Sequence, residues 1–182
     1  MKLLMDDEER KADSRKYTRD NRETWKKLGF RMLGAQVHDE DRNVVLAELE
    51  VLKHLRMCQL ADNPDTDAYT LWMVGQRNMA KIPSKEARRK LTEAALNSKG
   101  AAKINASLDT CKQHVRKATN ARNTFNEAEG DHDKQVVQQA RYTSHMNTAS
   151  AYFRLAQAQL EHADKVSVFG LTTPPAVEND DV

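Results

Sequence analysis

Two stretches in the second half of the chain carry apolar or small residues in alternating steps of three and four. In the first stretch these positions are Ala101, Ile104, Leu108, Cys111, Val115, Ala118 and Phe125, and the one exception to the spacing is Arg122. In the second stretch they are Tyr142, Met146, Ala149, Phe153, Ala156, Leu160 and Ala163. This spacing is typical of helices that pair along a coiled-coil seam.

The segment FNEAEGDHDKQ, residues 125–135, separates the two stretches. Gly130 is suited to the end of a helix and Asp131 to the start of the next one. Its acidic residues do not follow the order of a calcium-binding loop, so the segment is predicted to be a corner rather than a metal site.

A reversal at Gly130 pairs residues whose numbers sum to 260 or 261, and most pairs match a large residue with a small one. The predicted pairs are Ala101 with Leu160, Ile104 with Ala156, Leu108 with Phe153, Cys111 with Ala149, and Val115 with Met146. Such pairs allow two helices to approach closely without voids. We therefore predict an antiparallel helical hairpin over residues 100–166, with this coiled-coil-like seam.

The preceding region, residues 35–99, is predicted to be a multi-helix core. A helix over 39–61 is apolar almost all round, which is typical of a central helix. A second helix is predicted over 66–82. Pro83 and Ser84 are typical of the start of a third, over 85–97.

The two ends of the chain have a different character. Residues 1–34 are predicted to form a charged helical arm that ends in a first apolar cluster, because the first 24 positions hold few apolar side chains. Residues 167–182 contain two prolines and an acidic end, and we expect an extended acidic tail. The apolar side chains of this tail that could dock on another surface are Val168, Phe169 and Leu171.

The composition agrees with an all-α helical bundle. The chain has 182 residues, of which 31% are charged and 5% aromatic, with six glycines and four prolines. A β-sheet protein would need more turn residues and more β-branched and aromatic side chains.

Charge is distributed unevenly along the chain. Residues 1–120 contain 24 Lys and Arg against 18 Asp and Glu, a net charge of +6, whereas residues 121–182 contain five against nine, a net charge of −4. The two portions are therefore complementary, which favours docking within the chain or between copies.

The excess of positive charge is concentrated in residues 77–103. The basic residues are Arg77, Lys81, Lys85, Arg88, Arg89, Lys90, Lys99 and Lys103, against only Glu86 and Glu93. A face that follows nucleic-acid phosphates would have this composition, and so would an ordinary solvated face or one that meets an acidic protein. The region lacks the interleaved aromatic residues that stack on single strands.

Each cysteine has a histidine at helical spacing, which makes a zinc site conceivable. The four candidate ligands are His54, Cys58, Cys111 and His114. Both cysteines fall at apolar positions, where a free cysteine behaves as a small buried hydrophobe, and we therefore expect no metal and no cofactor. His114 falls opposite His145 across the hairpin and just off the seam. Such a pair could sense pH, although solvated side chains are the simpler expectation.

Motifs of catalysis and of membrane insertion are absent from the sequence. It contains no GxGxxG, P-loop, HExxH or GxSxG pattern, and no apolar run approaches the length of a membrane span. The start, MKLLMDDEE, is not typical of a signal or transit peptide, and two cysteines form no disulfide framework. We expect a protein of the cytoplasm, or of a particle assembled there.

These features together favour a non-enzymatic structural subunit of a larger self-associating assembly, such as a virion, ring or filament component. Its partners would be further copies of itself or other subunits. The alternative is a nucleic-acid-associated packaging or coating protein that oligomerises through the hairpin and contacts phosphates through residues 77–103.

Overall fold

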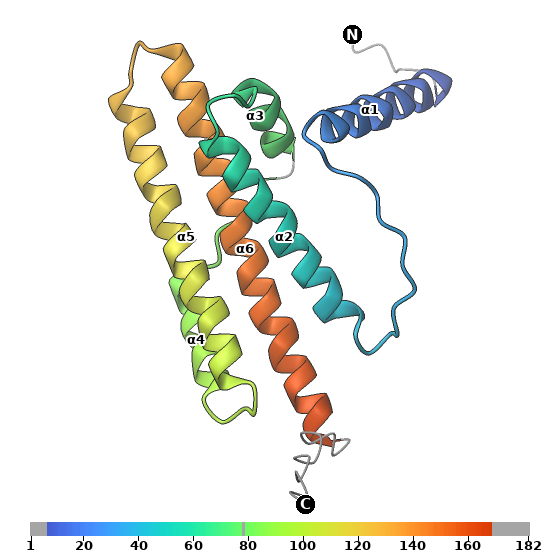
Figure 1. Ribbon diagram of the computed structural model, residues 1–182, viewed down its shortest axis with the longest axis vertical. Helices are drawn as coiled ribbons and strands as arrows, with labels where there is room; N and C mark the ends of the chain where they lie inside the picture. The colour runs from blue at the N-terminus through green and yellow to red at the C-terminus, as the bar shows by residue number, and fades with distance from the viewer. Residues whose placement is uncertain (1–6, 78, 169–182) are drawn as a thin grey trace, which may run out of the picture.

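The computed structural model describes residues 7–77 and 79–168, and over these residues the chain forms six α-helices and no β-strand (Figure 1). The helices are α1 (Asp7–Lys27), α2 (Arg42–Asp62), α3 (Ala68–Arg77), α4 (Lys85–Ala95), α5 (Ala101–Glu127) and α6 (His132–Val168). The predicted all-α class is confirmed. Among the helices described, none combines the length and the apolar character needed to cross a membrane.

The longest helix, α6, is the centre of the fold. α5 runs along one side of it and α2 along another, and α3 and α4 also contact it (Figure 1). Residues 143–149 of α6 are all buried, so for two turns this helix has no solvent-facing side. The other helices are arranged around this enclosed segment.

The chain reverses between α5 and α6 at Gly130, which has a φ of 91°. The Asp131 carboxylate accepts a hydrogen bond of 3.1 Å from the backbone N–H of Lys134, which caps the first turn of α6. Near the opposite end of α5, one core cluster joins α4, α5 and α6. Its residues are Leu91, Ala95, Ile104, Leu108, Phe153, Ala156 and Leu160.

A second face of α6 packs against α2. Ala151, Leu155 and Ala158 of α6 form a core cluster with Ala47 and Val51 of α2. The sequence left open whether this face of α6 meets earlier helices or another chain. In the structure it meets α2 of the same chain.

α1 is attached to the rest of the fold through its C-terminal end. Trp25, Leu28 and Phe30 pack against a core cluster made by α2, α3 and α6. Residues 10–20 are exposed, since this part of α1 carries almost no apolar side chains to bury. α1 therefore extends from the bundle as an arm, joined to α2 by a long non-helical segment (Figure 1).

α3 is shorter than the helix predicted over 66–82. The Asp67 carboxylate accepts hydrogen bonds of 3.1 and 3.3 Å from the backbone N–H groups of Tyr69 and Thr70, so the helix begins at Ala68. It ends at Arg77, before the predicted end, and the chain runs non-helically over 79–84 to α4.

Gly75 allows α3 to lie close to α6. A Cβ atom at this position would stand 2.6 Å from Cγ2 of Thr143, inside the buried segment of α6. The Thr143 hydroxyl donates to the carbonyl of Gln139, which fixes its rotamer and leaves the methyl group facing α3. The close approach of the two helices thus depends on the missing side chain.

We expect Gly75→Ala to destabilise the fold by about 1–2 kcal/mol, because overpacking outweighs the gain in helix propensity. The double variant Gly75→Ala/Thr143→Ser removes the clashing methyl group and should recover part of that loss. Urea unfolding measures both effects. Gly34→Ala is the control, since nothing lies within 4 Å of a Cβ there; an equal loss of stability at both glycines would contradict this explanation.

Candidate functional site

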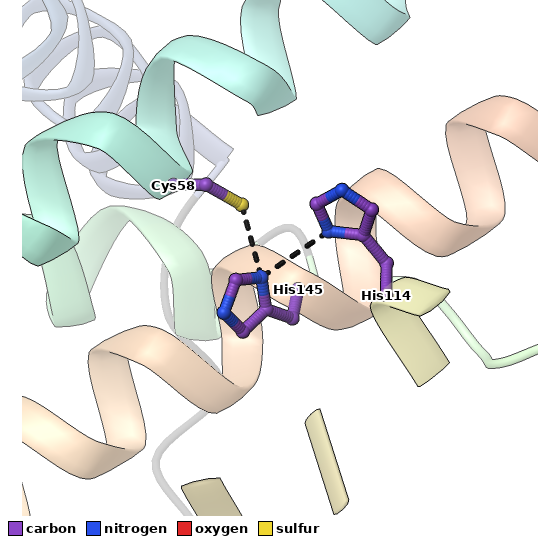
Figure 2. A group of neighbouring side chains, drawn as sticks. All are labelled: Cys58, His114 and His145. Atoms are coloured by element: carbon purple, nitrogen blue, oxygen red, sulfur yellow. Dashed lines mark hydrogen bonds between the residues drawn. The ribbon is translucent and has the colours of Figure 1, made fainter. Parts of the chain in front are cut away.

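Three potential metal ligands from three different helices converge in the interior of the bundle. Cys58 of α2, His114 of α5 and His145 of α6 point toward one another (Figure 2). The Cys58 Sγ lies 3.3 Å from Nδ1 of His145, and Nδ1 of His114 lies 3.2 Å from the same Nδ1. All three ligand atoms lie within 4.8 Å of one another.

All three side chains are buried, which corrects the expectation that His114 and His145 would be solvated. His114 is 7% and His145 8% exposed. In a hairpin of two helices alone, residues just off the seam would face solvent. In the structure α2 also packs against α6, and it brings Cys58 to the same place. On α5 the buried positions run through Cys111, His114 and Ala118, and Val115 is only half-buried.

Burial sets the protonation of the cluster. Desolvation lowers the pKa of His114 to about 4 and also lowers the pKa of His145, so both imidazoles are neutral at neutral pH and each carries a free lone pair. Desolvation raises the pKa of the Cys58 thiol to about 11. This is the opposite of the activation that a nucleophilic cysteine needs.

Thr148 completes the polar surroundings of Cys58. Its hydroxyl donates to the backbone carbonyl of Ser144 at 2.8 Å and lies 3.1 Å from the Cys58 Sγ. On the solvent side, His145 lines a surface hollow of about 450 Å³ together with Asp62, Lys117 and Arg141, among others. Of the three residues in the cluster, only His145 lines this hollow.

Of the four candidate ligands named from the sequence, the structure brings only Cys58 and His114 into this cluster. Cys111 is fully buried in α5, one helical turn from His114, and burial raises its pKa. His54 is buried in α2, and its Nδ1 has no hydrogen-bond partner among the described residues. The third member, His145, was identified from the sequence only as the residue opposite His114.

The residues predicted to pack the hairpin lie on α5 and α6, and they differ in burial. Buried positions are Ile104, Leu108, Cys111, Met146, Ala149 and Ala156, and half-buried positions are Val115, Phe153 and Leu160. Of the residues predicted for tail docking, Val168 is the last residue of α6, and Phe169 and Leu171 lie outside the described residues.

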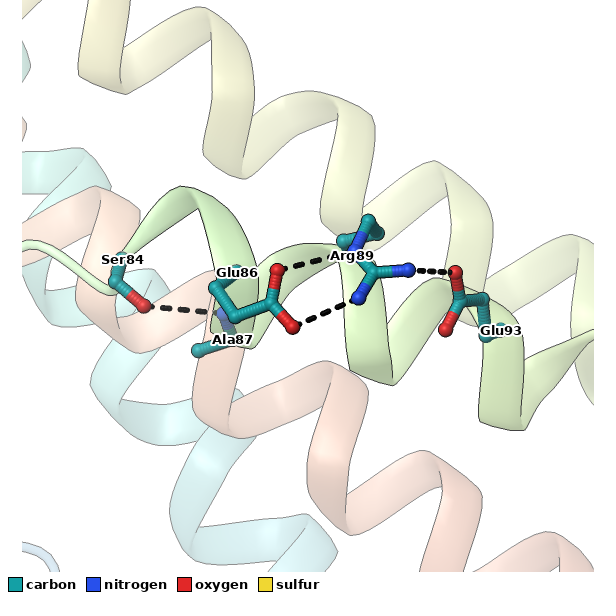
Figure 3. A network of polar contacts seen from close by, with 5 residues as sticks. All are labelled: Ser84, Glu86, Ala87, Arg89 and Glu93. Carbon is teal, nitrogen blue, oxygen red and sulfur yellow. Dashed lines mark hydrogen bonds and ion pairs between the residues drawn. The ribbon is translucent and has the colours of Figure 1, made fainter.

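The predicted basic region is spread over α3, α4 and the start of α5. Lys81, Lys85, Arg89, Lys90, Lys99 and Lys103 are exposed, Arg88 is half-buried, and Arg77 ends α3. α4 begins after Ser84, whose hydroxyl accepts a hydrogen bond of 3.0 Å from the backbone N–H of Ala87 (Figure 3).

Arg89 is less available to a phosphate than the sequence suggested. Its guanidinium lies between Glu86 and Glu93, with ion pairs of 2.8 and 2.5 Å along the exposed side of α4 (Figure 3). Lys85, Arg88, Lys112 and Arg116 line the adjoining groove between α4 and α5, whose volume is about 900 Å³. Lys112 in turn pairs with Asp109 at 2.9 Å.

Sequence reasoning missed the polar interior of α6. Asn147 is fully buried, and its side-chain oxygen accepts a hydrogen bond of 2.7 Å from the backbone N–H of Ala80. Thr143, Ser144 and Thr148 are also buried. The run TSHMNT offered no signal by itself, because polar residues are buried here by helices that lie far away in the sequence.

Comparison of the chain with models of protein families, with curated proteins and with solved structures gives no significant match in any of the three.

We expect the buried His54 to make the fold sensitive to acid. Desolvation lowers its pKa from 6.5 to about 4, so between these values the unfolded chain binds a proton that the folded chain does not. Above about pH 6.5 His54 is neutral in both the folded and the unfolded chain, and the stability that depends on its neutral form is fully present. It is lost as the pH falls towards 4, by on the order of 3 kcal/mol.

Urea unfolding at a series of pH values tests this expectation. His54→Leu should lose less stability between pH 6.5 and 4 than the wild-type chain. His38→Leu, at an exposed position in the segment before α2, should behave like the wild type. A His54→Leu variant with the wild-type pH dependence would show that His54 does not contribute.

Proposed function

We propose that the chain is a non-enzymatic structural subunit of a larger self-associating assembly, of the virion, ring or filament type, that assembles in the cytoplasm. The observation that carries this proposal is an outward-facing apolar stripe on α2. Leu46, Leu49 and Leu52 follow one another in steps of three, and they are 50%, 43% and 63% exposed. The opposite face of the same helix is buried against α6.

The segment between α1 and α2 also exposes apolar side chains. Met32 is 92% and Leu33 76% exposed. Met32 also lines a hollow of about 380 Å³ with Trp25 and Phe30, at the end of α1 that is attached to the bundle. Apolar side chains exposed at this density are typical of a surface that another protein covers.

A second copy of the chain is the partner that the charges favour. The first 120 residues carry a net charge of +6 and the remainder a net charge of −4, so two copies can place opposite charges against each other. Residues 10–20 of α1 extend from the bundle in solvent and are long enough to reach a neighbouring subunit. Burial of the leucine stripe would supply the affinity and the charges would orient the copies.

The two cysteines are not activated as nucleophiles, which agrees with a structural role. The Cys58 thiol has a raised pKa and is buried, and so is the Cys111 thiol. Neither has the lowered pKa and the access to solvent that cysteine nucleophiles require.

Nucleic-acid packaging is the second candidate function, and the groove between α4 and α5 is the observation that favours it. Four basic side chains, Lys85, Arg88, Lys112 and Arg116, line this groove in addition to Arg89. The carboxylates of Glu86 and Glu93 neutralise part of that charge. We therefore place this function after self-association.

The subunit proposal predicts that charge in the leucine stripe will disrupt the assembly. The chain has a mass of 20.7 kDa, and light scattering on a sizing column should show a larger particle for the wild type. Leu49→Glu/Leu52→Glu should shift the particle towards the monomer mass without loss of helicity. Leu96→Glu is the matched control, because Leu96 is 65% exposed at the end of α4, outside the stripe. A monomeric wild type would refute the proposal.

The packaging alternative predicts binding to duplex DNA that weakens steeply with salt, since each phosphate contact releases counterions. Fluorescence anisotropy with a labelled duplex at increasing NaCl concentration measures this dependence. Lys85→Gln/Arg116→Gln should reduce both the affinity and the salt dependence. Lys53→Gln, on α2 and away from the groove, should leave them unchanged. Absence of binding at low salt would eliminate this alternative.

A further inference from the structure

The cluster of Cys58, His114 and His145 has the composition of a transition-metal site. Each residue offers one ligand atom, and each atom comes from a different helix, so the site exists only in the folded bundle (Figure 2). One sulfur and two imidazole nitrogens suit Zn²⁺ and similar ions, whereas Mg²⁺ and Ca²⁺ prefer oxygen ligands.

Two of the three distances within the cluster are close to those between the ligands of a bound zinc ion, and the third is within 4.8 Å. Tetrahedral Zn²⁺ has bonds of about 2.0–2.1 Å to nitrogen and about 2.3 Å to sulfur, which places two nitrogens about 3.3 Å apart and a nitrogen and a sulfur about 3.5 Å apart. The two Nδ1 atoms here are 3.2 Å apart, and the Cys58 Sγ is 3.3 Å from Nδ1 of His145. Small side-chain movements would admit an ion at the centre.

Nδ1 of His145 is the atom that the other two ligand atoms share. Nδ1 of His145 carries either one proton or one lone pair, yet it has two close partners, the Cys58 Sγ and Nδ1 of His114. In either tautomer a single hydrogen or lone pair is shared between both partners. The Thr148 hydroxyl gives its proton to the Ser144 carbonyl, and its oxygen can accept the hydrogen of the Cys58 thiol.

A metal ion would engage all three atoms at once, because it accepts one lone pair from each of them. The thiol proton leaves when the sulfur binds, and the Thr148 hydroxyl, 3.1 Å from the Sγ, would then turn its hydrogen from the Ser144 carbonyl to the thiolate. The hollow that His145 lines together with Asp62 is the side from which an ion and a water molecule as fourth ligand would enter.

We propose that Cys58, His114 and His145 form a structural binding site for a thiophilic divalent metal ion, with Zn²⁺ as the ion that fits the ligands best. The bound ion would join α2 to both helices of the α5–α6 pair. This inference does not depend on self-association, since every ligand belongs to one chain.

Cobalt is the probe for the first test, because a thiolate bound to Co²⁺ gives a charge-transfer band and tetrahedral coordination gives intense visible bands. We expect the full-length chain to show both on titration with Co²⁺ under reducing conditions, and Zn²⁺ to displace the cobalt spectrum. Cys58→Ser should lose the charge-transfer band. His145→Gln should weaken Co²⁺ binding at least about tenfold.

The chain supplies matched controls for these variants. Cys111→Ser removes the other buried cysteine and His54→Gln another buried histidine, and both should keep the wild-type cobalt spectrum. A wild-type chain without a charge-transfer band overturns the proposal. A band that survives in Cys58→Ser and disappears in Cys111→Ser also overturns it.

A second measurement needs no variant and remains decisive if a substitution prevents folding. X-ray absorption of the Zn²⁺-loaded wild-type chain should give a first shell with one sulfur and two or more nitrogen or oxygen atoms, including imidazole scattering. A shell without sulfur, or with two sulfurs, would refute the assigned ligands.

Discussion

The enclosure of α6 over residues 143–149 is the constraint on which the rest of this fold depends. A helix segment without a solvent-facing side must place every side chain against other parts of the protein, and here most of these side chains are polar. Gly75 of α3 makes room for Thr143, and the backbone of Ala80 donates to Asn147. α5 and α2 provide His114 and Cys58 for His145. The position of each surrounding element is thus tied to one side chain of α6.

The sequence predicted well those parts of the fold in which neighbours along the chain decide the structure. Composition gave the helical class, and Pro83 and Ser84 marked the start of α4, where the structure has a Ser84 cap. The stretches with helix periodicity, residues 101–125 and 142–163, lie within α5 and α6. The end of α3 was harder to predict, since apolar residues continue beyond Arg77 although the helix does not.

The candidate site was predicted only in part, because it depends on a packing that no local pattern encodes. Cys58 and His114 were recognised as possible ligands, each paired with a residue on its own helix. The structure instead unites them with His145, through the docking of α2 across α6. That docking depends on the contacts of Ala47 and Val51 with Ala151 and Leu155 in the core. From the sequence alone, this face of α6 could equally have met another chain. Contacts at long range in the sequence decide between these two arrangements.

The two faces of α2 connect the interior of the molecule to its surface. The inner face carries Cys58 in the central cluster, and the outer face carries the leucine stripe that begins at Leu46. An ion bound between α2, α5 and α6 would hold α2 in one orientation on the bundle. The stripe would then be presented as a rigid surface, and association would cost less conformational entropy than with a mobile helix. A metal in the core would in this way strengthen contacts between subunits without touching them.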